Sequence, residues 1–138
     1  MKKLNFENPA YEWLIYRNDN FTVQVRSWVD SNKHHWNVYA NIFDTHPFFN
    51  EMTKVLDLHF HGGVTYEQRI THTPAQGIKY SWEKSYETLK VGSDYSHLHD
   101  DWFATQDPIF GIPSEIKSDA TQLVNQLLNL TTNSEVEQ

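Results

Sequence analysis

Two short runs near the N-terminus are separated by a polar turn, and the second run alternates between apolar and polar side chains. The runs are Tyr11–Arg17 and Phe21–Trp28, with Asn18, Asp19 and Asn20 between them. Successive side chains of a strand point to opposite faces, so this alternation predicts that the second run is a strand with one buried face. Asparagine and aspartate favour turns, because their side chains bond to nearby backbone groups. The stretch therefore predicts an antiparallel hairpin.

Further along, the same kind of pattern returns. The run WNVYANI places four apolar side chains on one strand face: Trp36, Val38, Ala40 and Ile42. Residues 78–82 and 86–91 flank a short polar turn at 83–85, which indicates a second hairpin. The run HPFFNEMTK, residues 46–54, is typical of a short helix or a helical turn.

The C-terminal region has helical periodicity. Apolar residues form one stripe between Ser114 and Leu130: Ile116, Ala120, Leu123, Leu127 and Leu130. Ser114 suits the N-cap and Glu115 suits the first turn, while residues 131–138 are expected to fray. Together the patterns predict a single α+β domain over residues 1–138, in which a twisted antiparallel sheet carries the C-terminal helix packed on it.

The charge of the chain narrows the classes of partner. The formal net charge is -7, and an acidic surface is not expected to hold DNA or RNA, because phosphate contacts need clustered Lys and Arg. It suits a basic protein surface or a cation instead. The chain has neither the apolar stretch of a signal peptide nor a run as long as a membrane span. We therefore expect a cytoplasmic protein with no membrane partner.

The run VLDLHFHGG, residues 55–63, combines a strand pattern with metal-binding side chains. One face carries Leu56, Leu58 and Phe60. The other face carries three side chains able to bind a metal: Asp57, His59 and His61. The following glycines allow positive φ or a close backbone approach. This face is either part of a site or a solvated strand face.

A second group of such side chains lies in GSDYSHLHDD. Its members fall within eight residues: Asp94, His97, His99, Asp100 and Asp101. The chain has no Cys, so a metal would be held by imidazole and carboxylate groups, as in the set His61, Asp94, His97 and Asp100. Zinc, Mn, Fe and Ni all accept these ligand types, so the ligands alone do not assign the metal, and we expect zinc. The alternative interpretation is a helix N-terminus with acidic caps.

Three segments taken in order carry a resemblance. They are WNVYANIFDTHPFF, LHFHGGVTY and KVGSDYSHLHDDW. The order resembles a family of small phage and prophage proteins with the motifs H-P, H-G-G-[LV]-T-[YF] and G-x-D-x-x-H-x-x-D. The positions that match are His46, Pro47, His61, Gly62, Gly63, Thr65, Tyr66, Gly92, Asp94, His97 and Asp100. The first thirty residues and the C-terminal helix depart from the pattern, and His59 and His99 fall outside it.

The resemblance implies a function in counteracting host defence, as in an anti-CRISPR protein. We expect a non-enzymatic inhibitor that binds a host defence protein with a basic surface, such as an RNA-guided CRISPR nuclease, and competes with its DNA. A zinc ion would then staple the fold. Two alternatives stay open at this point. One is a metal-dependent hydrolase with a water on the metal, and the other is a metal-free network of hydrogen bonds.

Overall fold

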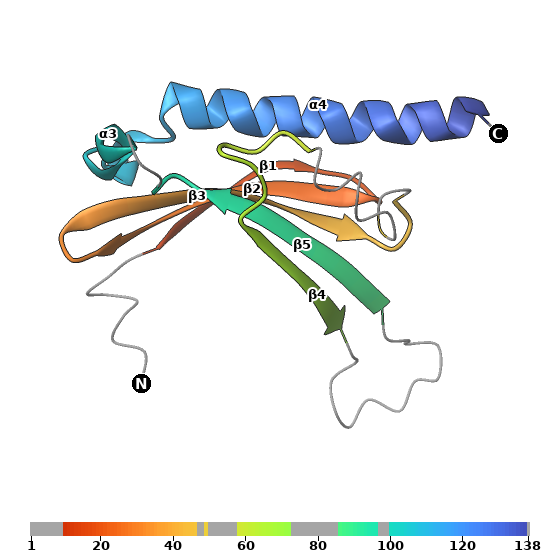
Figure 1. Cartoon of the computed structure of the whole chain (residues 1–138), viewed down its shortest axis with the longest axis horizontal. Coiled ribbons are helices and arrows are strands. Elements are labelled where there is room, and N and C mark those ends of the chain that lie inside the picture. The colour runs from red at the N-terminus through yellow and green to blue at the C-terminus, as the bar shows by residue number, and fades with distance from the viewer. Residues whose placement is uncertain (1–9, 47–48, 50–57, 73–85, 97–99, 138) are drawn as a thin grey trace.

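The computed structural model describes residues 10–46, 49, 58–72, 86–96 and 100–137, with side chains described as far as residue 129. Within these residues, five strands form one open sheet in the order β1-β2-β3-β5-β4, and all neighbouring pairs are antiparallel. A long C-terminal helix lies across one face of the sheet (Figure 1). This architecture confirms the predicted α+β class, a twisted antiparallel sheet with a C-terminal helix packed on it.

The elements have the following bounds. The strands are β1 (Tyr11–Arg17), β2 (Phe21–Asp30), β3 (Lys33–Phe43), β4 (Tyr66–His72) and β5 (Tyr86–Asp94). The helices are α3 (Asp101–Ala104), the 3-10 helix η1 (Pro108–Phe110) and α4 (Ser114–Glu137). Within the ranges described above, no helix is both long and apolar enough to cross a membrane.

The predicted N-terminal hairpin is confirmed as β1 and β2. The side-chain oxygen of Asn18 accepts hydrogen bonds from the backbone N–H groups of Asn20 (2.8 Å) and Phe21 (2.9 Å), which closes the turn. The next turn joins β2 to β3 through Ser31 and Asn32, whose φ angles are 53° and 62°. Two residues with positive φ match the twist of a tight hairpin. The sequence analysis did not predict this turn.

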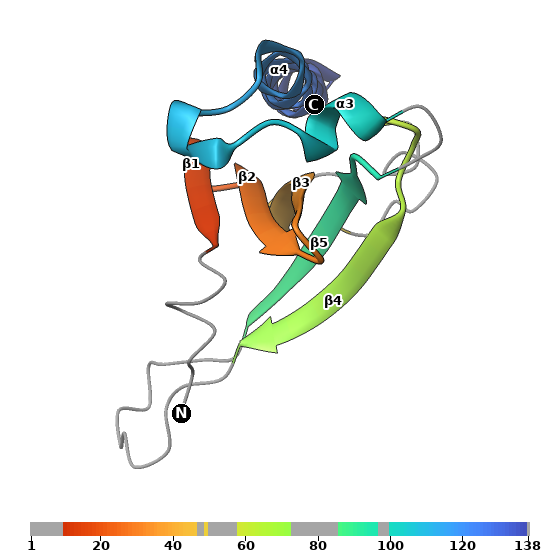
Figure 2. The same ribbon diagram turned by 90° about the vertical axis from the view of Figure 1, so that its left-hand side faces the viewer.

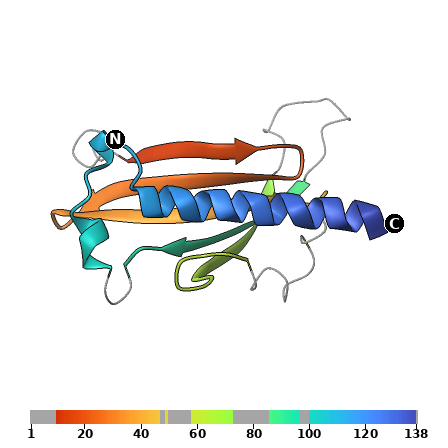
Figure 3. The same ribbon diagram turned by 90° about the horizontal axis from the view of Figure 1, so that it is seen from above.

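The core lies between the sheet and α4 (Figures 2 and 3). Alternate residues of β2, β3 and β5 are buried on that side: Phe21, Val23, Val25, Trp36, Val38, Ala40, Ile42, Leu89 and Val91. The apolar stripe of α4 is buried against them through Ile116, Ala120, Leu123 and Leu127. Each buried aliphatic side chain of this size contributes about 1.5–3 kcal/mol. Strands β4 and β5 turn away from α4, as Figure 1 shows, so α4 packs on β1, β2 and β3.

The ends of α4 differ from the prediction. The backbone N–H of Lys117 donates to the carbonyl of Pro113 (3.0 Å), so Pro113 is the capping residue and Ser114 is the first helical residue. The helix continues to Glu137, beyond Leu130 where the apolar stripe ends. Boundaries read from side-chain periodicity often differ from the backbone by a residue or more.

Residues 55–63 do not form the predicted strand in the part that is described. Residues 58–60 are irregular and residues 61–63 form a turn. The predicted alternation nevertheless holds, because Leu58 and Phe60 are buried while His59 and His61 are partly exposed. Strand β5 already bonds to β3 on one side and β4 on the other, so this segment packs through its side chains instead.

The second predicted hairpin is corrected in one arm. Strand β5 includes the predicted 86–91, but its hairpin partner is β4, Tyr66–His72, which the sequence analysis did not identify as a strand. The other predicted arm, residues 78–82, lies outside the described residues, as does most of the predicted helical turn at 46–54. In the described part of that turn, the N–H of Phe49 donates to the carbonyl of His46 (3.0 Å).

Candidate functional site

Two of the four predicted metal ligands are in direct contact. The Nε2 atom of His61 lies 2.8 Å from both carboxylate oxygens of Asp100. The Asp100 side chain is only 8% exposed, and the His61 side chain is 30% exposed. Asp100 directly precedes α3, and its carboxylate forms no capping bond to that helix. The carboxylate faces the histidine, so this contact ties the turn at 61–63 to the start of α3.

Asp94 is not brought to this pair. It ends β5 opposite Asn37 of β3, on the sheet face that α4 leaves uncovered. Its neighbour Ser93 points the other way, and its hydroxyl donates to the carbonyl of His61. The remaining predicted ligand, His97, lies outside the described residues. Among the residues whose positions are described, no group of three or more His, Cys, Asp or Glu side chains could hold a metal.

The ring of His61 is positioned by aromatic contacts. It stacks on Tyr95 with ring centroids 4.4 Å apart and an angle of 10° between the planes. Phe103 of α3 packs edge-on against both rings, with centroids at 5.9 Å from His61 and 4.9 Å from Tyr95. Gly62 and Gly63 have φ of 72° and 87°, so the chain turns sharply after His61 in a conformation that favours glycine. The paired glycines therefore serve the turn that presents this ring.

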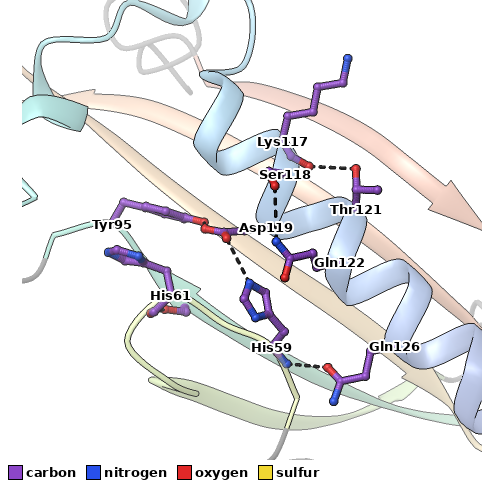
Figure 4. A network of polar contacts seen from close by, with 10 residues as sticks. His59, His61, Tyr95, Lys117, Ser118, Asp119, Thr121, Gln122 and Gln126 are labelled. Atoms are coloured by element: carbon purple, nitrogen blue, oxygen red, sulfur yellow. Dashed lines mark hydrogen bonds and ion pairs between the residues drawn. The ribbon is translucent and has the colours of Figure 1, made fainter.

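Further polar contacts join this cluster to α4 (Figure 4). The hydroxyl of Tyr95 donates to one oxygen of Asp119 (2.5 Å), and Nε2 of His59 lies 3.0 Å from the other. The backbone N–H of His59 donates to the side chain of Gln126 (2.7 Å). Burial, followed by the hydrogen bond to Asp119, raises the pKa of Tyr95 far above its ordinary value, so its hydroxyl remains a donor.

We call the set His59, His61, Tyr95, Asp100 and Asp119 the His/Asp network. The sequence analysis identified its two histidines and Asp100 but missed Tyr95 and Asp119. One signal for Asp119 was present, since a carboxylate next to Ala120 borders the apolar stripe of the helix. Chemically, the network can hold a proton between His61 and Asp100 or brace the fold.

His46 stands apart from this network. Its side chain is 2% exposed, and its Nε2 lies 3.3 Å from the carbonyl oxygen of Leu127 on α4. Burial lowers the pKa of His46 below its ordinary value, and the contact with the Leu127 carbonyl opposes this in part. His46 therefore braces the turn after β3 against the helix.

The segment between β5 and α4 exposes three large apolar side chains, and we call residues 101–113 the apolar segment. Phe110 is 90% exposed, Ile109 is 68% exposed and Trp102 is 49% exposed. The segment is nevertheless anchored. Asp107 caps η1 by accepting from the N–H of Ile109 (3.0 Å), and the indole of buried Trp36 donates to the carbonyl of Gln106 (3.2 Å).

A second candidate site is a hollow of about 420 Å³ on the uncovered face of the sheet. Its walls include aromatic side chains and two cations, Arg26 and Lys90. Tyr39 lies in its lining, and burial together with the neighbouring carboxylate of Glu12 raises the pKa of Tyr39 to about 12. The hollow lies on the opposite side of the sheet from the His/Asp network.

Comparison of the chain with protein-family models, with curated proteins and with solved structures finds no match. The resemblance to phage proteins therefore remains a prediction from the motifs. One geometric relation bears on those motifs: the contact between His61 and Asp100 joins the motif around H-G-G to the motif around G-x-D-x-x-H-x-x-D.

Proposed function

We propose that this protein is a phage-encoded, non-enzymatic inhibitor of a host nucleic-acid-targeting defence, and that it binds its target through the apolar segment. The observation that carries the proposal is the exposure of Phe110, Ile109 and Trp102 on an anchored segment. Clustered exposed apolar side chains on a soluble chain commonly mark a protein interaction site. Aromatic side chains of this kind are enriched among the residues that dominate binding energy.

The charge around the apolar segment indicates the kind of partner. Between residues 100 and 116 the chain carries four carboxylates and no Lys or Arg: Asp100, Asp101, Asp107 and Glu115. The last three are exposed. A segment that combines exposed apolar side chains with exposed carboxylates would suit a partner that offers apolar contacts and basic side chains. The DNA channel of an RNA-guided CRISPR nuclease in the host cytoplasm offers such a basic surface, and an inhibitor bound there would compete with DNA.

The His/Asp network has a supporting role in this proposal. Asp100 directly precedes the apolar segment, and Phe103 within the segment packs on His61 and Tyr95. The network therefore holds the segment in place before the partner arrives, which reduces the ordering that binding would otherwise require. A zinc ion, if held by His61, Asp100 and His97, would strengthen the same connection, and we retain it as part of the proposal.

The hydrolase alternative has less support. A catalytic site needs an accessible cavity beside its reacting groups. His61 and Asp100 do not line the hollow on the sheet or the small one beside η1, as far as the described residues show. The carboxylate of Asp100 faces a histidine and is nearly buried. These contacts fit a bracing role better than a catalytic one.

The test is a DNA cleavage assay with purified RNA-guided nucleases of candidate hosts. The wild-type protein is expected to slow cleavage and to bind the nuclease more weakly as salt is raised. Phe110→Ala and Trp102→Ala should each weaken binding by about tenfold or more, because exposed aromatic anchors carry much of the energy. Phe110 is almost fully exposed, so its loss should leave the melting temperature unchanged.

Leu14→Ala is the matched control. Leu14 is also an exposed apolar residue, at 56%, but it lines a hollow on the uncovered sheet face. Its removal should leave inhibition unchanged. Equal effects of the Leu14 and Phe110 substitutions would reject the apolar segment as the binding surface. Absence of binding to every nuclease tested would reject the choice of partner.

A further inference from the structure

The hollow on the uncovered face of the sheet is lined by four neighbouring strands and the residues that flank them. Its lining comes from β2, β3, β5 and the start of β4, on the side of the sheet away from α4. Gly92 of β5 lies between Tyr39 and Tyr66 in the register of the sheet. Gly92 therefore adds no side chain to the floor of the hollow, and β3 packs closely against it, since a Cβ atom there would lie 2.9 Å from Cβ of Tyr39. The volume, about 420 Å³, is in the range of small-molecule sites.

Two cations of this acidic chain face the same hollow. The ammonium of Lys90 lies 4.2 Å from the ring centroid of Tyr39 and 5.8 Å from that of Tyr66. The guanidinium of Arg26 lies 5.5 Å from the ring centroid of Trp28. Arg26 also has an ion pair with Glu12 at 3.8 Å, but both side chains are about half exposed, so solvent screens that pair. The two cations can therefore meet an anion that enters the hollow.

Flat surfaces for stacking accompany the cations. Trp28 stacks with His35 at 5.5 Å between centroids and 17° between planes. Tyr66 is 43% exposed at the edge of the hollow. An aromatic face that remains open accepts a planar ring of any identity, as in proteins that hold nucleobases on a sheet. The lining therefore combines stacking faces and positive charge within one small volume.

Polar groups for specific recognition are present as well. Asn37 lines the hollow, and its side-chain oxygen, which is itself buried, has no hydrogen-bond partner among the described residues. Buried polar atoms normally have partners, so a rotation of this side chain toward the hollow would let the amide bond to a ligand group. Asp94 also lines the hollow, and a carboxylate there can accept hydrogen bonds from sugar hydroxyls.

The geometry points to a nucleotide site in this hollow, independent of the proposed inhibitor function. We infer that a nucleobase stacks on Tyr66 or Trp28 while the phosphate lies against Lys90 and Arg26. The ligand is a nucleotide unit, either free or at one position of a single strand. The net charge of -7 favours the free form, because a longer polyanion is repelled by the rest of the surface.

Isothermal titration calorimetry with the full chain tests this inference. The probes are the four ribonucleoside monophosphates, the corresponding nucleosides without phosphate, and a short single-stranded oligonucleotide. At least one monophosphate should bind, and its nucleoside should bind about tenfold more weakly or worse, because the charge-assisted contacts are lost. Amide NMR signals of residues 90–94 should shift during the titration.

Matched substitutions assign the contacts. Lys90→Met should weaken monophosphate binding by about tenfold or more, whereas Lys117→Met, which removes the same charge from the exposed face of α4, should not change it. Tyr66→Leu should weaken binding, and Tyr66→Phe should retain it because the ring remains. Thermal melting of each variant checks that the fold is kept.

The outcomes are distinct. Tighter binding of the oligonucleotide than of any monophosphate, with the same dependence on Lys90 and Tyr66, would support the site and assign its ligand to single strands. Equal binding of nucleosides and monophosphates would overturn the inference, as would equal effects of the Lys90 and Lys117 substitutions. Absence of binding by every probe at millimolar concentration would also overturn it.

Discussion

His61 and Asp100 are separated by 39 positions in the sequence, and their side chains meet at 2.8 Å. This contact connects the turn at residues 61–63 to Asp100, the residue directly before α3. It also places the most buried carboxylate of the His/Asp network next to an imidazole. The stability of the region around α3 should therefore depend on this pair more than on the other predicted metal ligands.

Asp100→Asn tests that dependence. The substitution keeps the size of the side chain but removes the negative charge that faces His61. The free energy of unfolding should fall by about 1.5–3 kcal/mol, the range for a hydrogen bond to a charged group. Urea unfolding followed by circular dichroism measures the change. Asp94→Asn makes the same chemical change at the end of β5, away from the His/Asp network. It should lower the free energy of unfolding by less than Asp100→Asn does. Equal losses would contradict a special role for Asp100.

Stability should also depend on pH through His46. Its folded pKa lies below its ordinary value of 6.5, so between these two values the unfolded chain binds more protons than the folded chain. The free energy of unfolding should therefore fall as the pH drops below about 6.5, and this loss ends once the folded pKa is passed.

Unfolding curves of wild type and His46→Gln from pH 7.5 to pH 5 measure this effect. The variant should lose less stability than the wild type over this interval, although its stability at neutral pH is expected to be lower. Parallel pH dependence in the two proteins would assign the effect to other histidines.

The structure reduces the number of residues that we expect to bind the predicted zinc ion. Asp94 lies on the other face of the sheet from His61 and Asp100, so the expected donors reduce to His61, Asp100 and His97. Elemental analysis of the untagged protein should find about one zinc per chain. The Asp94→Asn protein should retain zinc, and the His61→Ala protein should lose it.

A chelator should lower the melting temperature of the wild type if that zinc is present, since binding stabilises the folded state. A wild-type protein without zinc would identify the His/Asp network as hydrogen bonds alone. The inhibitor proposal does not depend on that result, because the apolar segment and its exposed carboxylates are unaffected.

Two glycines should respond to alanine for different reasons. At Gly92 a Cβ atom would lie 2.9 Å from Cβ of Tyr39 and 3.0 Å from the carbonyl oxygen of Val38. Gly92→Ala should therefore cost about 1–3 kcal/mol through crowding between β3 and β5. At Gly63 there is space for a methyl group, but φ is +87°, so Gly63→Ala should cost about 1–2 kcal/mol through backbone strain.

Urea unfolding of both variants measures the two costs. The two mechanisms can be distinguished by NMR. The new Cβ in the Gly92 variant pushes against Tyr39 and moves it, whereas the strain in the Gly63 variant stays within its own turn. The amide NMR signals of β3 should therefore shift in the Gly92 variant and remain in place in the Gly63 variant. A Gly92 variant as stable as wild type would show that β3 and β5 can separate at little cost.

Local patterns determined much of the fold. The alternation in β2 and β3 identified which side chains face the core, because the period of two is a property of the extended backbone itself. The apolar stripe from Ile116 to Leu127 identified the buried face of α4 for the corresponding helical reason. The pair of glycines after His61 indicated a turn with positive φ, since few other residues adopt it.

Tertiary structure decided the rest. Residues 58–60 join the core through the buried side chains of Leu58 and Phe60 without pairing as a strand, which their alternating pattern alone does not distinguish. Packing also decided which carboxylate contacts His61. Asp94 ends β5 and points to the uncovered face of the sheet, away from His61, whereas Asp100 directly precedes α3 and contacts His61. Tyr95 and Asp119 joined the network because α4 crosses the sheet at that point. Spacing along the chain identifies side chains with the right chemistry, but only packing between distant segments determines which of them meet.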